Sequence, residues 1–133
     1  MGIEIDQEIQ STACIKSDTV LCLDNNAGDM RFKLTVSFAH AGTTGIGQAS
    51  LGTPGLGHGG SFWFSSQDNP EILVKVLPAC GINHKFWVFI DAATNVSFTL
   101  NLLDTMTGAT KTYSNPDNTA AVPVQDTSAF GCP

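Results

Sequence analysis

The sequence has few basic residues. Its 133 residues include six Lys and Arg against twelve Asp and Glu, which gives a net charge of −6 at neutral pH. Proteins that bind nucleic acid need a surface rich in Lys and Arg to neutralise phosphates, so this composition excludes nucleic acid as a partner. No apolar run approaches the ~20 residues that cross a bilayer, so we also expect no membrane insertion.

Catalytic and helical patterns are also lacking. The sequence contains no G-x-S-x-G nucleophile elbow, and no C-x-x-C pair or His spacing typical of a zinc site. Asp68 and Glu71 lie close together, but we expect both in one exposed turn, which is a poor environment for acid–base catalysis. No segment has a sustained apolar period of 3.6 residues. We therefore expect a protein that is not an enzyme and that has no helix.

What the sequence does have is short runs of alternating apolar and polar residues, the pattern of a half-buried strand. In residues 31–39 the inward set is Phe32, Leu34, Val36 and Phe38, and the water-facing set is Arg31, Lys33, Thr35 and Ser37. Residues 96–103 repeat the pattern with Val96, Phe98, Leu100 and Leu102 inward. This second run and residues 109–114 predict a hairpin with Gly108 at its turn.

Further strands are predicted at residues 19–24, 85–91 and 121–125. Between Gly42 and Gly60 lie eight of the thirteen glycines, which predict a flexible surface loop with one short edge strand near residues 46–51. Seven or eight short strands predict an all-β fold, an antiparallel β-sandwich of Ig-like or jelly-roll-like type. We expect one domain over residues 12–133, preceded by an N-terminal strand or leader over residues 1–11.

The stretch GSFWFSSQDNPEILVKVL, residues 60–77, predicts a second hairpin turned at Gln67–Pro70. Its inward set is expected to be Phe62, Phe64, Ile72, Val74 and Val76. In residues 85–90, Phe86, Val88 and Ile90 likewise oppose Trp87 and Phe89. We expect both tryptophans to be largely buried. The alternative is that Trp63 or Trp87 is exposed and binds a sugar or a protein surface.

Two loops carry oxygen side chains that suit calcium, which takes six to eight oxygen ligands. The first loop offers Asp68, Asn69 and Glu71, and the second offers Asp24 and Asp29. Neither has the spacing of an EF-hand, and Asn-Pro is ordinary turn chemistry. We expect no cofactor, with calcium as the alternative.

Four cysteines are present, at positions 14, 22, 80 and 132. An even number in a small chain favours two disulfides and an oxidising compartment, and four cysteines allow three pairings. The alternative is four buried thiols in a cytosolic protein. The opening residues, MGIEIDQEIQ, lack the basic and apolar regions of a signal peptide, which fits either a cytosolic protein or a mature secreted domain.

Several motifs together resemble an uncharacterised β-rich domain of secreted and cell-surface bacterial proteins. They are LCL near residue 22, FWFSSQDNPEILVKVL, the run KFWVFID, DTMTGATKTY, and VQDTSAF before the last cysteine. The resemblance covers about residues 12–133. It implies an extracellular module and the disulfide pairs Cys14–Cys22 and Cys80–Cys132.

Three functions remain open on this basis, besides a small secreted hydrolase or inhibitor. The first is a non-catalytic extracellular module for adhesion, assembly or display on a protein or polysaccharide surface. The second is a carbohydrate-binding module that uses an exposed tryptophan and is stabilised by calcium. The third is a self-assembling subunit, because Ile3, Ile5 and Ile9 alternate with acidic residues and predict a strand that pairs with its own sheet, with a neighbour's sheet, or with nothing.

Deletion of residues 1–10 separates these three possibilities for the N-terminal segment. If the segment completes its own sheet, the deletion should lower the melting temperature without changing the size in gel filtration, because an isolated strand needs a sheet edge. Loss of an oligomer would instead indicate exchange between subunits through residues 3–9. An unchanged size and stability would contradict both pairing within the domain and exchange between subunits.

Overall fold

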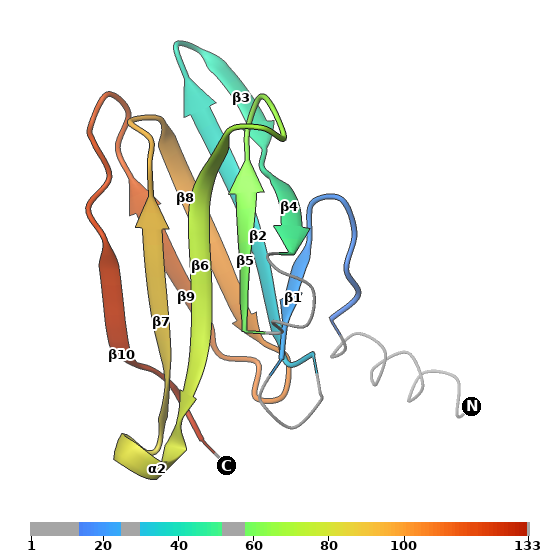
Figure 1. The fold of residues 1–133 in the computed structure, drawn as a ribbon, viewed down its shortest axis with the longest axis vertical. Coiled ribbons are helices and arrows are strands. Elements are labelled where there is room, and N and C mark those ends of the chain that lie inside the picture. The colour runs from blue at the N-terminus through green and yellow to red at the C-terminus, as the bar shows by residue number, and fades with distance from the viewer. Residues whose placement is uncertain (1–13, 25–29, 52–57, 133) are drawn as a thin grey trace.

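The computed structural model of the chain describes residues 14–24, 30–51 and 58–132. These residues form ten strands in two five-stranded antiparallel sheets that pack face to face (Figure 1). Sheet A contains β1 (Leu21–Leu23), β2 (Phe32–His40), β3 (Thr43–Ile46), β8 (Ser97–Asp104) and β9 (Thr110–Asn115), in the order β1-β2-β8-β9 with β3 paired to β2. Sheet B contains β10 (Val124–Gly131), β7 (Lys85–Ala92), β6 (Pro70–Ala79), β5 (Gly59–Trp63) and β4 (Gln48–Leu51), in that spatial order. The all-β prediction is confirmed, but the predicted count of seven or eight strands is wrong.

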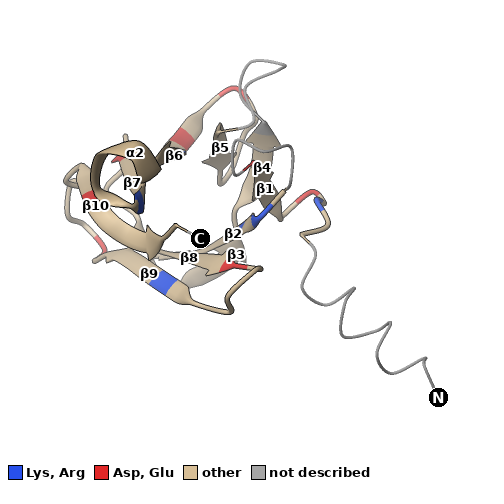
Figure 2. Cartoon of the chain, turned by 90° about the horizontal axis from the view of Figure 1, so that it is seen from below, with Lys and Arg blue, Asp and Glu red and all other residues tan. Residues whose placement is uncertain are grey.

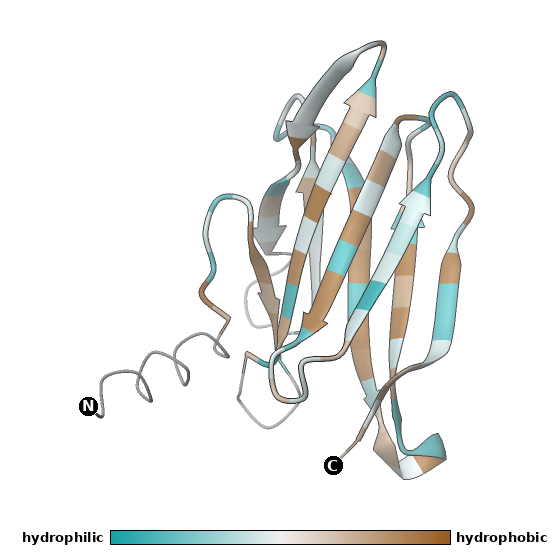
Figure 3. Ribbon diagram, turned by 180° about the vertical axis from the view of Figure 1, so that it is seen from behind, coloured by the Kyte–Doolittle hydropathy of each residue, from teal (hydrophilic) through white to brown (hydrophobic). Residues whose placement is uncertain are grey.

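The core lies between the sheets and is built from the alternating runs that the sequence shows. Figure 3 shows this alternation of hydrophobic and hydrophilic residues along β2 and β8. The predicted inward residues of these two runs are buried, except Phe38 and Val96, which are half-buried. The most deeply buried side chains from both sheets include Phe32, Leu34, Val36, Phe62, Val74, Val88 and Leu100. Complete burial of such a side chain stabilises the fold by about 1.5–3 kcal/mol.

The glycine-rich region holds more strand than predicted. Two short strands, β3 and β4, are separated only by Gly47, whose N–H donates to the carbonyl of Val36 at 2.8 Å. At this residue the chain passes from sheet A to sheet B, which closes one side of the fold (Figure 2). Gly45 lies opposite Phe38, and a Cβ there would be 2.5 Å from a ring atom of Phe38. Glycine at this position therefore makes room for an aromatic ring rather than providing a mobile loop.

The predicted hairpin over residues 60–77 is formed by β5 and β6. Phe62 pairs with Ile72 across the ladder, and both are buried together with Val74 and Val76. Phe64 lies beyond the end of β5 and is half-buried, where its ring stacks on Phe38 with 4.4 Å between centroids. The hairpin therefore contributes to the core of its own domain, as expected.

Two other expectations differ from the structure. One helical turn, α2 (Cys80–Asn83), connects β6 to β7, although no helix was expected. The last strand begins at Val124, three residues later than predicted, because Pro123 has no N–H to give to the ladder. The predicted strand over residues 3–9 and the ligand candidate Asp29 lie outside the described residues.

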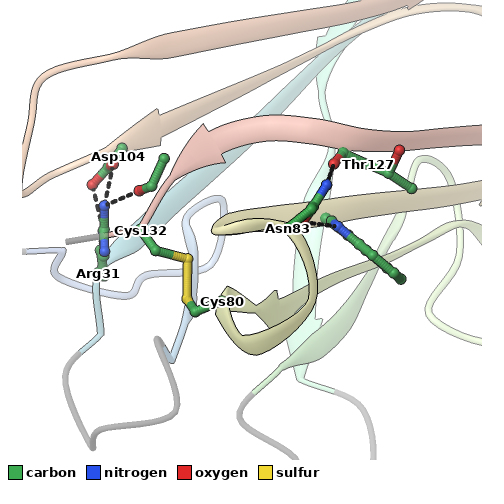
Figure 4. Close-up of a disulfide and its surroundings, with 8 residues drawn as sticks. Arg31, Cys80, Asn83, Asp104, Thr127 and Cys132 are labelled. Atoms are coloured by element: carbon green, nitrogen blue, oxygen red, sulfur yellow. Dashed lines mark hydrogen bonds and ion pairs between the residues drawn. A yellow bond between two sulfur atoms is a disulfide. The ribbon is translucent and has the colours of Figure 1, made fainter.

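Arg31 is the clearest correction to the sequence analysis, because it was expected to face water and is instead buried. Its guanidinium donates two hydrogen bonds to the Asp104 carboxylate, each at 2.7 Å, and a third to the carbonyl of Gly131 at 3.3 Å (Figure 4). Both charged side chains are at most 2% exposed. The start of β2, the end of β8 and the C-terminal end of β10 are thereby joined at one point.

The Asp104 carboxylate is held in its charged form. Burial alone would raise the pKa of Asp104, but hydrogen bonds from Arg31, the Thr107 hydroxyl and the Met106 N–H outweigh burial and hold the pKa below its ordinary value. Asp104 therefore also orders the turn between β8 and β9, in which Gly108 has a φ of 81°.

The four cysteines form two disulfides. Cys14 is bonded to Cys22 in β1, and Cys80 in α2 is bonded to Cys132, the residue after β10. This is the pairing that the resemblance implies. The second bond lies beside the Arg31 ion pair in Figure 4, so covalent and ionic links hold the same end of the fold. Two disulfides fit an oxidising environment.

Replacement of Asp104 with Ala should destabilise the fold by about 3–5 kcal/mol, because it leaves the Arg31 charge buried without a partner. The stabilising effect of this carboxylate is complete above its unfolded-state pKa and is lost as pH falls through the lower folded-state pKa. Urea unfolding at pH 7 and at pH 3 checks both points. The difference between wild type and Asp104→Ala should shrink at the lower pH, and a constant difference would contradict the assignment.

Candidate binding face on sheet B

The two tryptophans named from the sequence lie on the outer side of sheet B. Each is half-buried, so neither the largely buried nor the fully exposed interpretation describes it. Trp63 pairs with Pro70, whereas Trp87 pairs with Leu77. Seven residues of an extended strand span ~23 Å, so the two rings lie near opposite ends of this face. They do not form one platform.

Trp87 is committed to contacts within the domain. Its indole N–H donates to the Asn83 side-chain oxygen at 2.9 Å, and the Asn83 amide donates to the carbonyl of Thr127 at 2.9 Å (Figure 4). Its ring meets that of Phe89 edge to face, with 6.2 Å between centroids. Trp87 therefore links α2, β7 and β10, and it positions Phe89.

A shallow groove lies beside Phe89 on the same outer face, with a volume of about 230 Å³. The strand register explains why its walls meet. Leu73 pairs with Asp91, Lys75 pairs with Phe89, and Phe89 pairs with Gln125 on its other side. Alternation points all five side chains away from the core. Ile90, Pro123 and Val124 complete the lining.

The groove combines an aromatic ring with hydrogen-bonding groups of each kind. Lys75 can donate, Asp91 can accept, and the Gln125 amide can do both. Leu73 is 49% exposed and Phe89 is half-buried, so apolar surface is open to a ligand at this point. Phe89 was not among the residues predicted to bind a ligand, although the alternation in KFWVFID places it on the same face as Trp87.

The outer face of sheet A is different in character. Its outward residues are mostly hydroxyl and amide side chains, including Thr35, Ser37, Thr99, Asn101, Thr112 and Ser114. The Thr112 hydroxyl donates to the Asn101 side chain at 3.2 Å, so part of this surface is satisfied by cross-strand contacts. A polar outer face is the ordinary condition of a sheet with one wetted side. The outer face of sheet B departs from this ordinary condition.

The calcium candidates Asp68, Asn69 and Glu71 lie in and just after the exposed turn between β5 and β6. The turn is held by its own hydrogen bonds, from the Asp68 N–H to the Ser66 hydroxyl at 3.2 Å and from the Asn69 N–H to the Ser66 carbonyl at 2.9 Å. Asp24 lies directly after β1, far from this turn in the chain. Within the described ranges, no three His, Cys, Asp or Glu side chains form a group that could hold a metal ion. Calcium binding stays a prediction.

His40 and Asp117 are in hydrogen-bond contact at the surface, with 3.0 Å between Nδ1 and Oδ1. The hydrogen bond from His40 lowers the pKa of Asp117, and the Ser97 N–H contributes in the same direction. The pair fixes the loop after β9 against the ends of β2 and β8.

Comparisons with known proteins give no match. No family model matches the chain, and neither a curated protein nor a solved structure does so. In the part of the chain that the structure describes, no helix has the length and apolar character needed to cross a bilayer.

Replacement of Asn83 with Ala should loosen the contacts around Trp87, because it removes the acceptor of the indole N–H and the donor to Thr127. In a Trp63→Phe background, Trp87 is the single tryptophan, and acrylamide should quench its fluorescence more efficiently when Asn83 is replaced. The matched control is the same substitution with Trp87→Phe and Trp63 retained, where quenching should not change. Equal effects in both backgrounds would contradict a local role for Asn83.

Proposed function

We propose that the chain is a non-catalytic extracellular β-sandwich module, of Ig-like or jelly-roll-like type, that serves adhesion, assembly or display. Its contact surface is the outer face of sheet B. The resemblance to domains of secreted bacterial proteins supports the compartment, and two disulfides are consistent with it.

The observation that carries this proposal is the apolar and aromatic surface on the outside of sheet B. An isolated exposed apolar residue on a protein needs no explanation, but a contiguous group rimmed by polar side chains marks an interaction site. Leu73, Leu77, Trp87 and Phe89 form such a group by strand register, with Lys75, Asp91 and Gln125 around Phe89. Aromatic residues are also enriched at protein interfaces in general.

The position of the groove supports binding rather than catalysis. It lies on an open sheet face, where a bound molecule keeps contact with water. Acid–base catalysis depends on groups whose environments shift their pKa values, usually by burial in a cleft that excludes water. Lys75, Asp91 and Gln125 are all exposed, which suits recognition of a polar ligand.

Carbohydrate is the ligand class that this groove fits as a second, more specific function. A sugar ring presents an apolar face that stacks on an aromatic side chain and a rim of hydroxyls that both donate and accept hydrogen bonds. Phe89 supplies the ring, and Lys75, Asp91 and Gln125 supply complementary groups. The residues proposed for sugar contact are therefore these, in place of Trp63 and Trp87, and Asp68, Asn69 and Glu71 stay the candidates for stabilisation by calcium.

Cosedimentation with insoluble cellulose, chitin and peptidoglycan tests the carbohydrate function. We expect wild type to bind at least one of them, and Phe89→Ala to bind at least tenfold more weakly, a loss of about 1.4 kcal/mol. Leu103→Ala on the outer face of sheet A is the matched control and should bind as wild type does. Equal binding by Phe89→Ala, or no binding by wild type, would reject carbohydrate as the ligand of this groove.

Beads coated with the domain test the broader role in adhesion or assembly. Coated beads should cluster with one another or adhere to the polysaccharides above, and Phe89→Ala should reduce this. Clustering that is unchanged by Phe89→Ala would show that the contact surface lies elsewhere than on the outer face of sheet B. Absence of both clustering and adhesion would reject the proposal for this face.

A further inference from the structure

The fold is closed on one side and open on the other. On the closed side, β1 and β4 lie side by side, and the Ala49 N–H donates to the Asp18 carbonyl at 2.7 Å (Figure 2). On the opposite side, β9 ends sheet A and β10 ends sheet B, and among the described strands these two are not paired with each other. The two sheets are therefore not joined by main-chain hydrogen bonds between β9 and β10.

Side chains bridge part of this opening. The Tyr113 hydroxyl on β9 donates to the Asp126 carboxylate on β10 at 2.8 Å, and the Lys111 ammonium lies 3.9 Å from the same oxygen. Burial raises the pKa of Tyr113, and the hydrogen bond to Asp126 adds to this effect, so the hydroxyl stays a donor. The bridge closes the opening toward the end of the fold that holds α2 and leaves it open beside the loop over residues 116–123.

A cavity of about 420 Å³ lies in the part that stays open. Its walls come from both sheets and from the loop between β9 and β10. Apolar surface dominates the lining, with contributions from Ile90, Ala92, Phe98, Tyr113, Ala121 and Val124. Volumes of 300–1,000 Å³ are typical of sites for small molecules.

The main polar side chains of the wall already have partners within the protein. The Asn115 amide donates to the carbonyls of Val96, Pro116 and Thr119, at 3.3, 3.1 and 2.8 Å. The Ala121 N–H donates to the Thr94 carbonyl at 3.1 Å, which holds the loop over the cavity. A polar group that entered would lose its bonds to water and meet mostly apolar surface, at a cost of about 1–3 kcal/mol. The cavity therefore selects an apolar occupant.

We propose that this cavity binds a small uncharged molecule with one alkyl chain. The overall charge of −6 disfavours an anionic ligand. A peptide strand of ordinary length spans ~17 Å and would have to pass the Tyr113–Asp126 bridge, which excludes that occupant. The site is on the inner side of β7 and β10, and it shares Ile90, Pro123 and Val124 with the groove on their outer side.

Nuclear magnetic resonance titration of the wild-type domain with 1-octanol tests the proposal. Amide signals of Ala92, Phe98, Tyr113 and Ala121 should shift and saturate together. The matched ligand is 1,8-octanediol, which has the same length but would bury a second hydroxyl, and it should bind at least tenfold more weakly. No saturable shift up to the solubility limit, shifts elsewhere in the domain, or equal binding of the diol would overturn the proposal.

A cavity-filling variant gives a second measurement. Ala121→Phe should abolish the 1-octanol shifts, because the ring would occupy the space. Ala109→Phe, at the exposed turn before β9, is the matched control and should bind as wild type does. Retained binding in a folded Ala121→Phe domain would overturn the proposal, and the wild-type titration decides the question if that variant does not fold.

Discussion

The buried ion pair between Arg31 and Asp104 is the contact on which the arrangement of the two sheets depends. Two charges removed from water are stabilising only when geometry and further hydrogen bonds offset the loss of hydration. Here the pair is bidentate, Asp104 accepts additional bonds from its own turn, and the guanidinium lies over the rings of Phe32 and Phe86 at 5.2 and 4.8 Å. Because Arg31 also donates to Gly131, one side chain holds both sheets.

Both proposed binding sites follow from where this anchor places β10. The strand is held at its C-terminal end by Arg31 and by the disulfide from Cys132, and along its length by pairing with β7. Its outward residue Gln125 then forms one wall of the groove beside Phe89, and its inward residue Val124 forms one wall of the cavity. A displacement of β10 would therefore alter both surfaces at once.

Alternation of apolar residues was sufficient to predict most of the core, because a strand exposes one face and buries the other. Phe32, Leu34, Val36, Leu100 and Leu102 are all buried as the pattern requires. The same rule misplaced Arg31, which parity assigned to water. Its partner lies 73 residues away, and a contact of that range leaves no local pattern.

The residues that form the proposed binding face could be grouped from the sequence only in part, for a related reason. Alternation placed Trp87 and Phe89 together, but the groove also needs Leu73, Lys75 and Gln125, which come from two other strands. Their proximity depends on strand order and register, and the order β10-β7-β6 is not visible in a single sequence. Likewise, glycines that suggested a mobile loop serve at Gly45 to accommodate Phe38, a neighbour defined by pairing.

A double-mutant cycle between the two links at this end of the fold tests the central claim most directly. One variant replaces the ion pair by Arg31→Met with Asp104→Leu, the second removes the disulfide by Cys80→Ala with Cys132→Ala, and the third combines both changes. If the ion pair and the disulfide hold the same end of β10, their effects on the free energy of unfolding should be coupled by about 1 kcal/mol or more, the range seen for sites that share a network. Effects that add within about 0.5 kcal/mol would contradict the claim that these links act as one anchor.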